Sequence, residues 1–276
     1  MIDTAPRTFV LVHGGGHGGW CWQRLARELR ARGHDVWTPT LTGFGERRHL
    51  GGPDTPFATF VTDIVHVLDH EDLHDVVLVG HSMGGVVVPR VAEVARERVG
   101  RVVWLAAVVA HDGETLLDAV PQTPEIARAV TIEPDGTART DHRLMAEVLM
   151  PEGTDEDRAW VTARHCAYPP AALVEPGRLS AFRALDLPAS YIAATADAAI
   201  PLALARTFAA RLPDAHYAEV DAGHDLMITR PRATADALEA VCAQVEANGE
   251  TQANGETQAN ADTDTDTDTD TDTVTD

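Results

Sequence analysis

The sequence predicts an α/β fold in which a mostly parallel sheet is flanked by helices and carries a helical cap insertion. Three observations lead to this prediction. Short apolar runs alternate with helix-like segments from residue 8 to residue 109 and again from residue 190 to residue 245. The pattern Gly-His-Ser-Met-Gly joins one of these runs to the helix-like segment that follows it. Between the two alternating parts, residues 112–186 are rich in proline and polar turns.

The first alternating part contains apolar, β-branched runs of strand length. These runs are Thr8–His13, Asp35–Thr38, Asp75–Val79 and Arg101–Val109. The segments between them place apolar residues three or four positions apart, as the buried face of a helix requires. The predicted helices are Trp20–Arg32, Phe57–His70 and Met83–Arg98. Strands that alternate with helices in this way form a parallel sheet with crossover helices.

The alternation resumes after the proline-rich region. The predicted strands and helices of this second part are Ser190–Thr195, Leu202–Leu212, His216–Val220 and Ala233–Val245, in chain order. Within the proline-rich region, Leu144–Leu149 and Asp155–His165 have helical spacing, so we expect helices over the sheet and not a further sheet unit. The predicted domains are a core of residues 1–111 and 187–246 and a cap of residues 112–186.

Residues 247–276 form an acidic, low-complexity tail. ANGETQ occurs there twice, and Asp alternates with Thr from residue 262 to residue 273. This composition cannot bury enough apolar surface to offset the entropy of ordering, so we expect disorder. The tail holds nine acidic residues and no Lys or Arg. The formal net charge of the whole chain is −21, so residues 1–246 carry a net charge of −12. An acidic core argues against nucleic acid as a partner, because phosphates need a basic surface.

Cysteine usage and hydropathy bear on the compartment. Cys21, Cys166 and Cys242 lie far apart without metal-ligand or redox spacing, so we expect buried packing residues, no disulfide and no metal. The N-terminus lacks the long apolar core of a signal peptide, and no stretch approaches the roughly 18 apolar residues of a membrane span. We therefore expect a cytoplasmic protein with no membrane partner. The oligomeric state is left open.

Ser82 lies in a Gly-x-Ser-x-Gly pattern between an apolar run and a helix-like segment. The pattern alone recurs by chance, but a strand before it and a helix after it are what a nucleophile elbow requires. Gly80, Gly84 and Gly85 permit a turn so tight that side chains there would clash. The sequence therefore predicts a serine nucleophile at the end of a strand, with the N-terminal amides of a helix aimed at it.

A serine nucleophile needs a base, and the base needs an acid that orients it. Of the thirteen histidines, His224 follows the last predicted strand in a loop that returns to the strand ends beside the elbow. Asp197 follows the preceding strand and is the predicted acid, because the chain order Ser, Asp, His is typical of such elbows. Asp112 is the alternative acid, and we weigh it lower because it stands where the insertion begins.

The oxyanion of a tetrahedral intermediate needs two amide donors. One is expected to be the backbone N–H of Met83, directly after the nucleophile. The other is expected from the glycine-rich loop HGGGHGGW, residues 13–20, where backbone amides can approach a ligand closely. A phosphate-binding loop is the alternative for this segment. It is disfavoured because no Gly-Lys-Ser/Thr follows and no suitable acidic residue ends the next strand.

The motifs FVLVHGGGHGGWCW, LVGHSMGG, YIAATADAAIP and DAGHDLMI resemble those of the α/β-hydrolase superfamily. They are most similar to the branch with plant methylesterases, hydroxynitrile lyases and small bacterial esterases. The resemblance covers residues 7 to about 245 and is weakest in the insertion, which is the cap over the active site in this family. It implies the family's site residues at these positions: nucleophile Ser82, base His224, acid Asp197, and the oxyanion amides of Gly15 and Met83.

Two positions separate lyases from esterases in this branch. Hydroxynitrile lyases carry a threonine where this chain has Gly14, and a lysine directly after the catalytic histidine, where it has Asp225. An acid cannot replace the cation that stabilises leaving cyanide, so the resemblance favours an esterase. We expect Asp225 to be solvated and to face outward. If it faced the pocket, its charge would raise the pKa of His224.

The sequence thus predicts a serine hydrolase that cleaves small-molecule carboxylic esters through an acyl-enzyme, without cofactor or metal. The candidate substrate-pocket residues are Gly14, His17, His81, Trp160, Tyr168 and Phe182. The alternative is a non-hydrolytic protein of the same fold, such as a cyclase, decarboxylase or ligand binder in secondary metabolism. The complete Ser, Asp and His set favours hydrolysis. The acyl and alcohol groups are left open because they depend on the cap.

Overall fold

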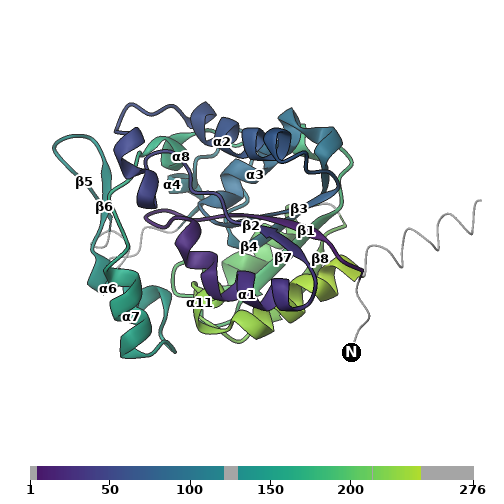
Figure 1. The fold of residues 1–276 in the computed structure, drawn as a ribbon. Helices are drawn as coiled ribbons and strands as arrows, with labels where there is room; N and C mark the ends of the chain where they lie inside the picture. Colours follow the sequence, from purple (N-terminus) through teal and green to yellow (C-terminus); the bar gives the residue numbers. More distant parts are fainter. Residues whose placement is uncertain (1–4, 121–129, 213, 244–276) are drawn as a thin grey trace, which may run out of the picture.

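The structure is a computed structural model that describes residues 5–120, 130–212 and 214–243. The predicted acidic tail, residues 247–276, lies outside the described residues. A six-stranded sheet with the order β2-β1-β3-β4-β7-β8 forms the centre of the molecule, and all neighbouring strands are parallel. Helices cover both of its faces (Figure 1). The predicted α/β fold class is therefore confirmed.

The strands of this sheet follow the predicted apolar runs. They are β1 (Thr8–Val12), β2 (Asp35–Trp37), β3 (Val76–Ser82), β4 (Val99–Ala107), β7 (Ala189–Ala194) and β8 (His216–Val220). β3 and β4 are buried almost throughout, as expected for central strands covered on both faces. β3 extends further than predicted, so that its last residue is Ser82.

The helices form one layer on each face of the sheet. They are α1 (Gln23–Ala31), α2 (Phe57–His70), α3 (Gly84–Val94), α10 (Leu202–Ala210), α11 (Leu226–Thr229) and a last helix over residues 231–243. α2, α3 and α10 pack on the strand residues of one face, such as Val10 and Leu78. α1, α11 and the last helix pack on the alternate residues, such as Leu11 and Val79. Figure 1 shows α2 and α3 on one side of the sheet and α1 on the other.

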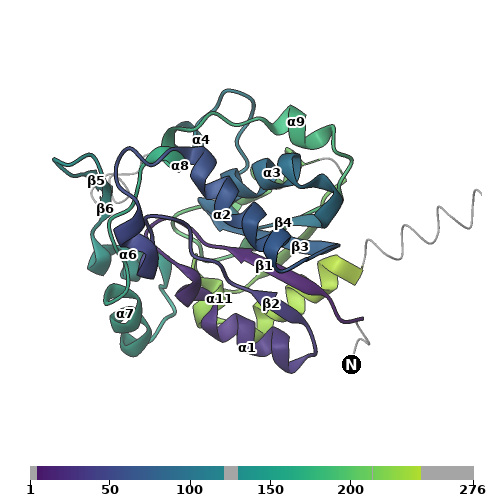
Figure 2. The ribbon, with the colours of Figure 1, turned by 45° about the horizontal axis from the view of Figure 1, so that its top comes forward.

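The insertion is helical in part. Its elements are α4 (Leu116–Ala119), β5 (Val130–Ile132), β6 (Ala138–Thr140), α6 (His142–Leu149), α7 (Asp155–Thr162), α8 (Ala171–Val174) and α9 (Leu179–Arg183). The insertion expected to be helical also contains a feature that was not predicted, because β5 and β6 pair as an antiparallel hairpin. Gly136, at φ +86°, lies in the turn between them. The hairpin, α6 and α7 lie together at one end of the molecule (Figures 1 and 2).

The insertion is fastened to the loops at the carboxyl ends of the strands. The Cys166 N–H donates to the Gly16 carbonyl at 3.2 Å, and the Gly223 N–H donates to Glu152 at 3.0 Å. Loops at this edge of a parallel sheet are where α/β proteins place their sites. Among the described residues, no helix has the length and apolar character needed to cross a bilayer.

Candidate active site

Ser82 stands on a strained turn between β3 and α3. Its φ of +52° lies in the left-handed region, which a non-glycine residue rarely adopts. A Cβ at Gly80 would lie 2.7 Å from the Gly84 carbonyl oxygen, and a Cβ at Gly84 would lie 2.7 Å from the Val12 carbonyl oxygen. The two glycines therefore let α3 start directly against β3 and β1, as predicted for the elbow. The side chain of Ser82 is partly exposed at the strand end.

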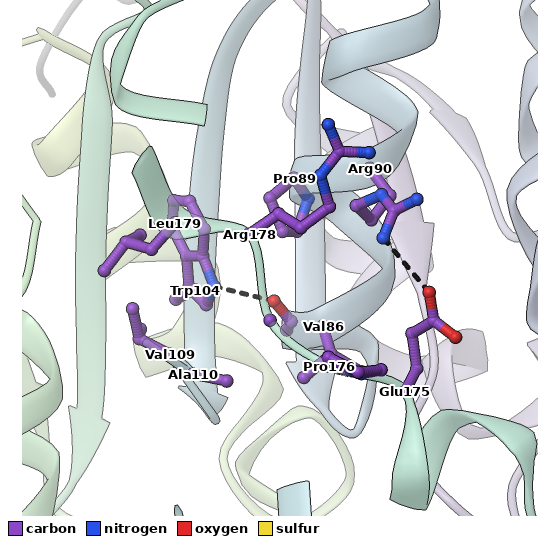
Figure 3. Close-up of a pocket in the computed structure, with 12 residues that line it drawn as sticks. Val86, Pro89, Arg90, Trp104, Val109, Ala110, Glu175, Pro176, Arg178 and Leu179 are labelled. Atoms are coloured by element: carbon purple, nitrogen blue, oxygen red, sulfur yellow. Dashed lines mark hydrogen bonds and ion pairs between the residues drawn. The ribbon is translucent and has the colours of Figure 1, made fainter. Parts of the chain in front are cut away.

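The first turns of α3 are tied to β4 and to the insertion. The Trp104 indole N–H donates to the Gly85 carbonyl at 3.0 Å, and Arg90 pairs with Glu175 at 3.1 Å (Figure 3). The cavity that these groups line has a volume of about 20 Å³, room for about one water molecule. It does not include Ser82 among its lining residues, so we regard it as a support of the elbow and not as a ligand site.

His224 and Asp197 form a buried hydrogen-bonded pair. The His224 Nδ1–H donates to Asp197 Oδ2 at 2.7 Å, and the two residues are 3% and 6% exposed. Asp197 Oδ1 accepts the backbone N–H groups of Ala199 and Ile200 at 2.7 and 2.8 Å, which fixes the carboxylate. Burial lowers the pKa of His224, but the charge and hydrogen bond of Asp197 outweigh it and the net pKa is raised.

The alternative acid lies elsewhere. Asp112 is exposed and accepts the backbone N–H and the hydroxyl of Ser180 in the insertion. Its hydrogen bonds therefore serve the start of the insertion and not an imidazole. Of the two acids considered, the structure brings Asp197 to His224.

Ser82 and His224 open onto the same cavity, together with both predicted oxyanion residues, Gly15 and Met83. The cavity has a volume of about 240 Å³. The hydrogen bonds of the described residues do not include one between Ser82 and His224. Such bonds are often long before substrate binds, and they tighten in the complex. With Nδ1 bonded to Asp197, Nε2 is the nitrogen left to accept the serine proton.

The predicted oxyanion loop, residues 13–20, is held in place by a histidine whose role the sequence analysis missed. The His13 Nδ1–H donates to the Gly14 carbonyl at 2.9 Å, while Nε2 accepts the Leu41 N–H at 3.1 Å. The Gly14 carbonyl and the Gly15 N–H belong to one peptide unit, so His13 sets the direction of the predicted oxyanion donor. Burial lowers the pKa of His13 to about 3, which keeps the ring neutral. The sequence signal that could have revealed this role is the position of His13 directly before the glycine run.

Gly14 lies directly behind the serine. A Cβ at this position would lie 2.8 Å from Ser82 Cβ and 3.1 Å from His81 Nδ1. The threonine that hydroxynitrile lyases carry here therefore has no room in this structure. Gly14 and His81 are not among the residues that line the cavity, which corrects their assignment to the substrate pocket. His81 instead donates its Nε2–H to the His224 carbonyl at 3.1 Å.

Of the remaining predicted pocket residues, His17 and Tyr168 line the cavity and Trp160 and Phe182 do not. Trp160 packs edge-on against Trp20, and Phe182 packs edge-on against Trp104. Both aromatic rings serve packing, so their assignment to the pocket is wrong. The lining residues that the sequence did not reveal are mostly aliphatic: Leu116, Leu117, Val120, Val130, Ile132, Leu149, His165, Leu173 and Ala199.

The expectation for Asp225 is also wrong. The residue is fully buried, and Asp225 Oδ2 lies 3.2 Å from His17 Nε2. Its backbone N–H donates to the Leu149 carbonyl, so α6 covers the position that was expected to face solvent. Burial raises the pKa of Asp225, but the charge and hydrogen bond of His17, with weaker contributions from His81 and His224, hold it well below the ordinary range.

The described part of the chain holds no group of three or more His, Cys, Asp or Glu side chains arranged to bind a metal ion. All three cysteines are buried, as predicted, and their thiols are free.

Comparisons with known proteins agree with this architecture. Residues 9–237 match the model of the Alpha/beta hydrolase family. A carbendazim hydrolyzing esterase from Nocardioides sp. (strain SG-4G) is 32% identical over 238 residues, which cover 84% of this chain and 98% of that protein. Methylesterase 7 of Arabidopsis thaliana is 32% identical over 114 residues, or 39% of this chain and 42% of that relative.

Among solved structures, an extracellular alpha/beta-hydrolase from a Paenibacillus species superposes with a TM-score of 0.72 at 26% identity. The match covers 84% of this chain and 97% of that chain. Its description reports structural and functional homology to tobacco salicylic acid binding protein 2. These matches confirm the predicted resemblance to plant methylesterases and bacterial esterases. The chain therefore belongs to the α/β-hydrolase family.

Proposed function

We propose that this chain hydrolyses small-molecule carboxylic esters through an acyl-enzyme on Ser82. The observation that carries the proposal is the single cavity onto which Ser82, His224, Gly15 and Met83 all open, with Asp197 hydrogen-bonded behind His224. Two relatives are named as esterases, one as a carbendazim hydrolyzing esterase and one as a methylesterase, which supports the same reaction class for this chain.

In the proposed reaction, Ser82 Oγ attacks the acyl carbonyl while His224 Nε2 takes the hydroxyl proton. Asp197 stabilises the imidazolium that forms. The N–H groups of Gly15 and Met83 donate to the oxyanion, and Met83 stands at the start of α3, where the helix dipole also favours negative charge.

Collapse of the intermediate breaks the bond to the alcohol oxygen, which receives its proton from His224. Water then attacks the acyl-enzyme with His224 again as base, and the acid leaves as Ser82 regains its proton. These steps use only groups of the chain and water.

The cavity lining supports neutral, apolar esters as the substrates. Most of its aliphatic side chains come from the insertion, and the described lining contains no Lys, Arg, Asp or Glu. A cationic substrate would lose its hydration there without gaining a carboxylate partner, and the aliphatic side chains favour an uncharged group. We therefore propose an apolar acyl or alcohol group that fits the volume of about 240 Å³. We also propose a cytoplasmic location, which the three free thiols support.

Ser82→Ala tests the proposal. We expect it to lower kcat for short p-nitrophenyl esters by at least about 10⁴-fold, because no other nucleophile replaces the hydroxyl. A fluorophosphonate probe should label the original chain at Ser82 and fail to label the variant. Ser180→Ala is the matched control, since Ser180 is exposed and bonded to Asp112.

Full activity of Ser82→Ala would contradict the acyl-enzyme. A labelled protein that cleaves none of a broad set of esters would instead favour the non-hydrolytic alternative.

A further inference from the structure

A second histidine–carboxylate pair lies beside the oxyanion loop, and the reaction proposed above does not use it. His17 and Asp225 are 2% and 0% exposed. His17 Nε2 lies 3.2 Å from Asp225 Oδ2, and His17 Nδ1 lies 2.9 Å from the Gly15 carbonyl oxygen. The pair thus connects the residue after the proposed base to the residue of the proposed oxyanion donor.

The two partners of His17 determine its protonation. A carbonyl oxygen only accepts hydrogen bonds, and so does an ionised carboxylate. The two hydrogen bonds can therefore form at the same time only when both ring nitrogens carry a proton. His13 provides the contrast, because its two nitrogens face one acceptor and one donor and its ring is neutral.

Together, the two histidines hold the peptide units on both sides of Gly15. His13 binds the Gly14 carbonyl, and His17 binds the Gly15 carbonyl. Glycine has no side chain to restrict its backbone, so an oxyanion donor within three successive glycines needs external support. The direction of the Gly15 N–H depends on both hydrogen bonds.

We propose that Asp225 and His17 are positioning residues of this site: Asp225 holds His17 as an imidazolium, and His17 holds the Gly15 carbonyl and with it the oxyanion loop. The inference rests on the proposed function. The orientation of the pair relative to the cavity agrees with this role, since the residues that line the cavity include His17 but not Asp225. His17 thus lies on the cavity side of the pair, and the carboxylate lies behind it.

Asp225 also acts on the proposed base. The groups that face His224 are Asp197 after β7, His81 of β3 with ring centroids 4.7 Å apart, and Asp225 itself. Glu152 of the insertion reaches the neighbouring Gly223 N–H. The negative charges of Asp197 and Asp225 raise the pKa of His224, so removing the charge of Asp225 should lower it.

Asp225→Asn is the first test, with hydrolysis of a p-nitrophenyl ester measured from pH 5 to pH 9. We expect kcat to fall about 10-fold or more, with KM little changed, because a misplaced donor acts on the transition state. The acid limb of kcat/KM should move to lower pH. Asp63→Asn is the matched control: the side chain of Asp63 is 8% exposed and is also paired, with Arg47 at 2.9 Å, but it lies in α2. It should leave the acid limb in place.

His17→Ala and the double variant test whether the two residues act as a unit. If Asp225 works through His17, the double variant should lose no more kcat than His17→Ala alone. Circular dichroism and thermal unfolding of each variant separate loss of fold from loss of rate. Independent, multiplicative losses would overturn the proposal.

Nitrogen-15 NMR of the resting protein tests the pair without any substrate. At one and the same near-neutral pH, we expect both ring nitrogens of His17 to carry a proton in the original chain and one of them to lose it in Asp225→Asn. A His17 with a single protonated ring nitrogen in the original chain would overturn the proposal. If the original chain hydrolyses no ester, the proposed function fails, and the NMR result still decides whether the pair exists.

Discussion

At the scale of a single residue, the carboxylate of Asp197 makes two sets of hydrogen bonds, one with each oxygen. Oδ2 accepts the His224 Nδ1–H, while Oδ1 accepts the N–H groups of Ala199 and Ile200. In Asp197→Asn, the side-chain oxygen must stay with the two amides, so the NH₂ group faces His224. The imidazole then takes the wrong tautomer, with its proton on Nε2.

We expect Asp197→Asn to lower kcat for ester hydrolysis by about 10⁴-fold, with little effect on folding. Removing this charge also lowers the pKa of His224, so the acid limb of the pH–rate profile should move to lower pH. Asp112→Asn is the control, because Asp112 is the alternative acid and bonds Ser180. A larger loss of rate in Asp112→Asn than in Asp197→Asn would reverse the assignment of the acid.

Single residues also show what a sequence leaves undetermined. Ser82, Asp197 and His224 could be predicted because each follows a recognisable strand, and parallel strands end at one edge of the sheet. Asp225 was misplaced because its burial depends on α6 and the carbonyl of Leu149. Local pattern says little about how short cap segments pack on a distant loop.

At the scale of elements, the contact of α3 with β1 decides where Ser82 stands. A Cβ at Gly84 would lie 2.7 and 3.0 Å from the carbonyl oxygens of Val12 and His13, which are backbone atoms and cannot rotate away. Gly84→Ala should therefore push α3 from β1 and move the serine. We expect a loss of about 1–3 kcal/mol in the free energy of unfolding and of at least about 10-fold in kcat.

Urea unfolding and ester hydrolysis measure the two effects of Gly84→Ala. Gly52→Ala is the matched control, because a Cβ there meets no atom within 4 Å. Equal stability and rate in the two variants would show that α3 tolerates the added carbon and that the close contact does not fix the elbow.

The elements of the insertion were the least predictable. The β5–β6 hairpin has strands of three residues, too short for a periodic pattern. Its sequence signal is the run Glu-Pro-Asp-Gly-Thr at residues 133–137, which is typical of a tight turn. Two of the aromatic residues assigned to the pocket, Trp160 and Phe182, do not line it, for a different reason. Large rings bury most area against each other, so Trp160 and Phe182 pack on Trp20 and Trp104 while aliphatic residues line the cavity.

The whole molecule carries several buried histidines between the sheet and the insertion, and their opposite pKa shifts affect its stability. Burial lowers the pKa values of His13 and His81, whereas Asp197 and Asp225 raise that of His224. In the unfolded chain all three rings take up a proton near pH 6.5. As the pH falls below that value, His13 and His81 therefore destabilise the folded state, and His224 partly offsets them.

His13 allows this balance to be measured. Its pKa falls to about 3 in the folded protein, so between pH 7 and pH 5 only the unfolded chain binds its proton, which costs about 2 kcal/mol of stability. His13→Asn can still donate to the Gly14 carbonyl but does not titrate. We expect the variant to be less stable at pH 7, yet to lose about 2 kcal/mol less than the original chain on going to pH 5. Urea unfolding at both pH values measures the difference, with the exposed His70→Asn as control. If His13→Asn and the original chain lose the same stability over this interval, the ring takes up its proton in the folded state, and the neutral tautomer assigned to the oxyanion loop is wrong.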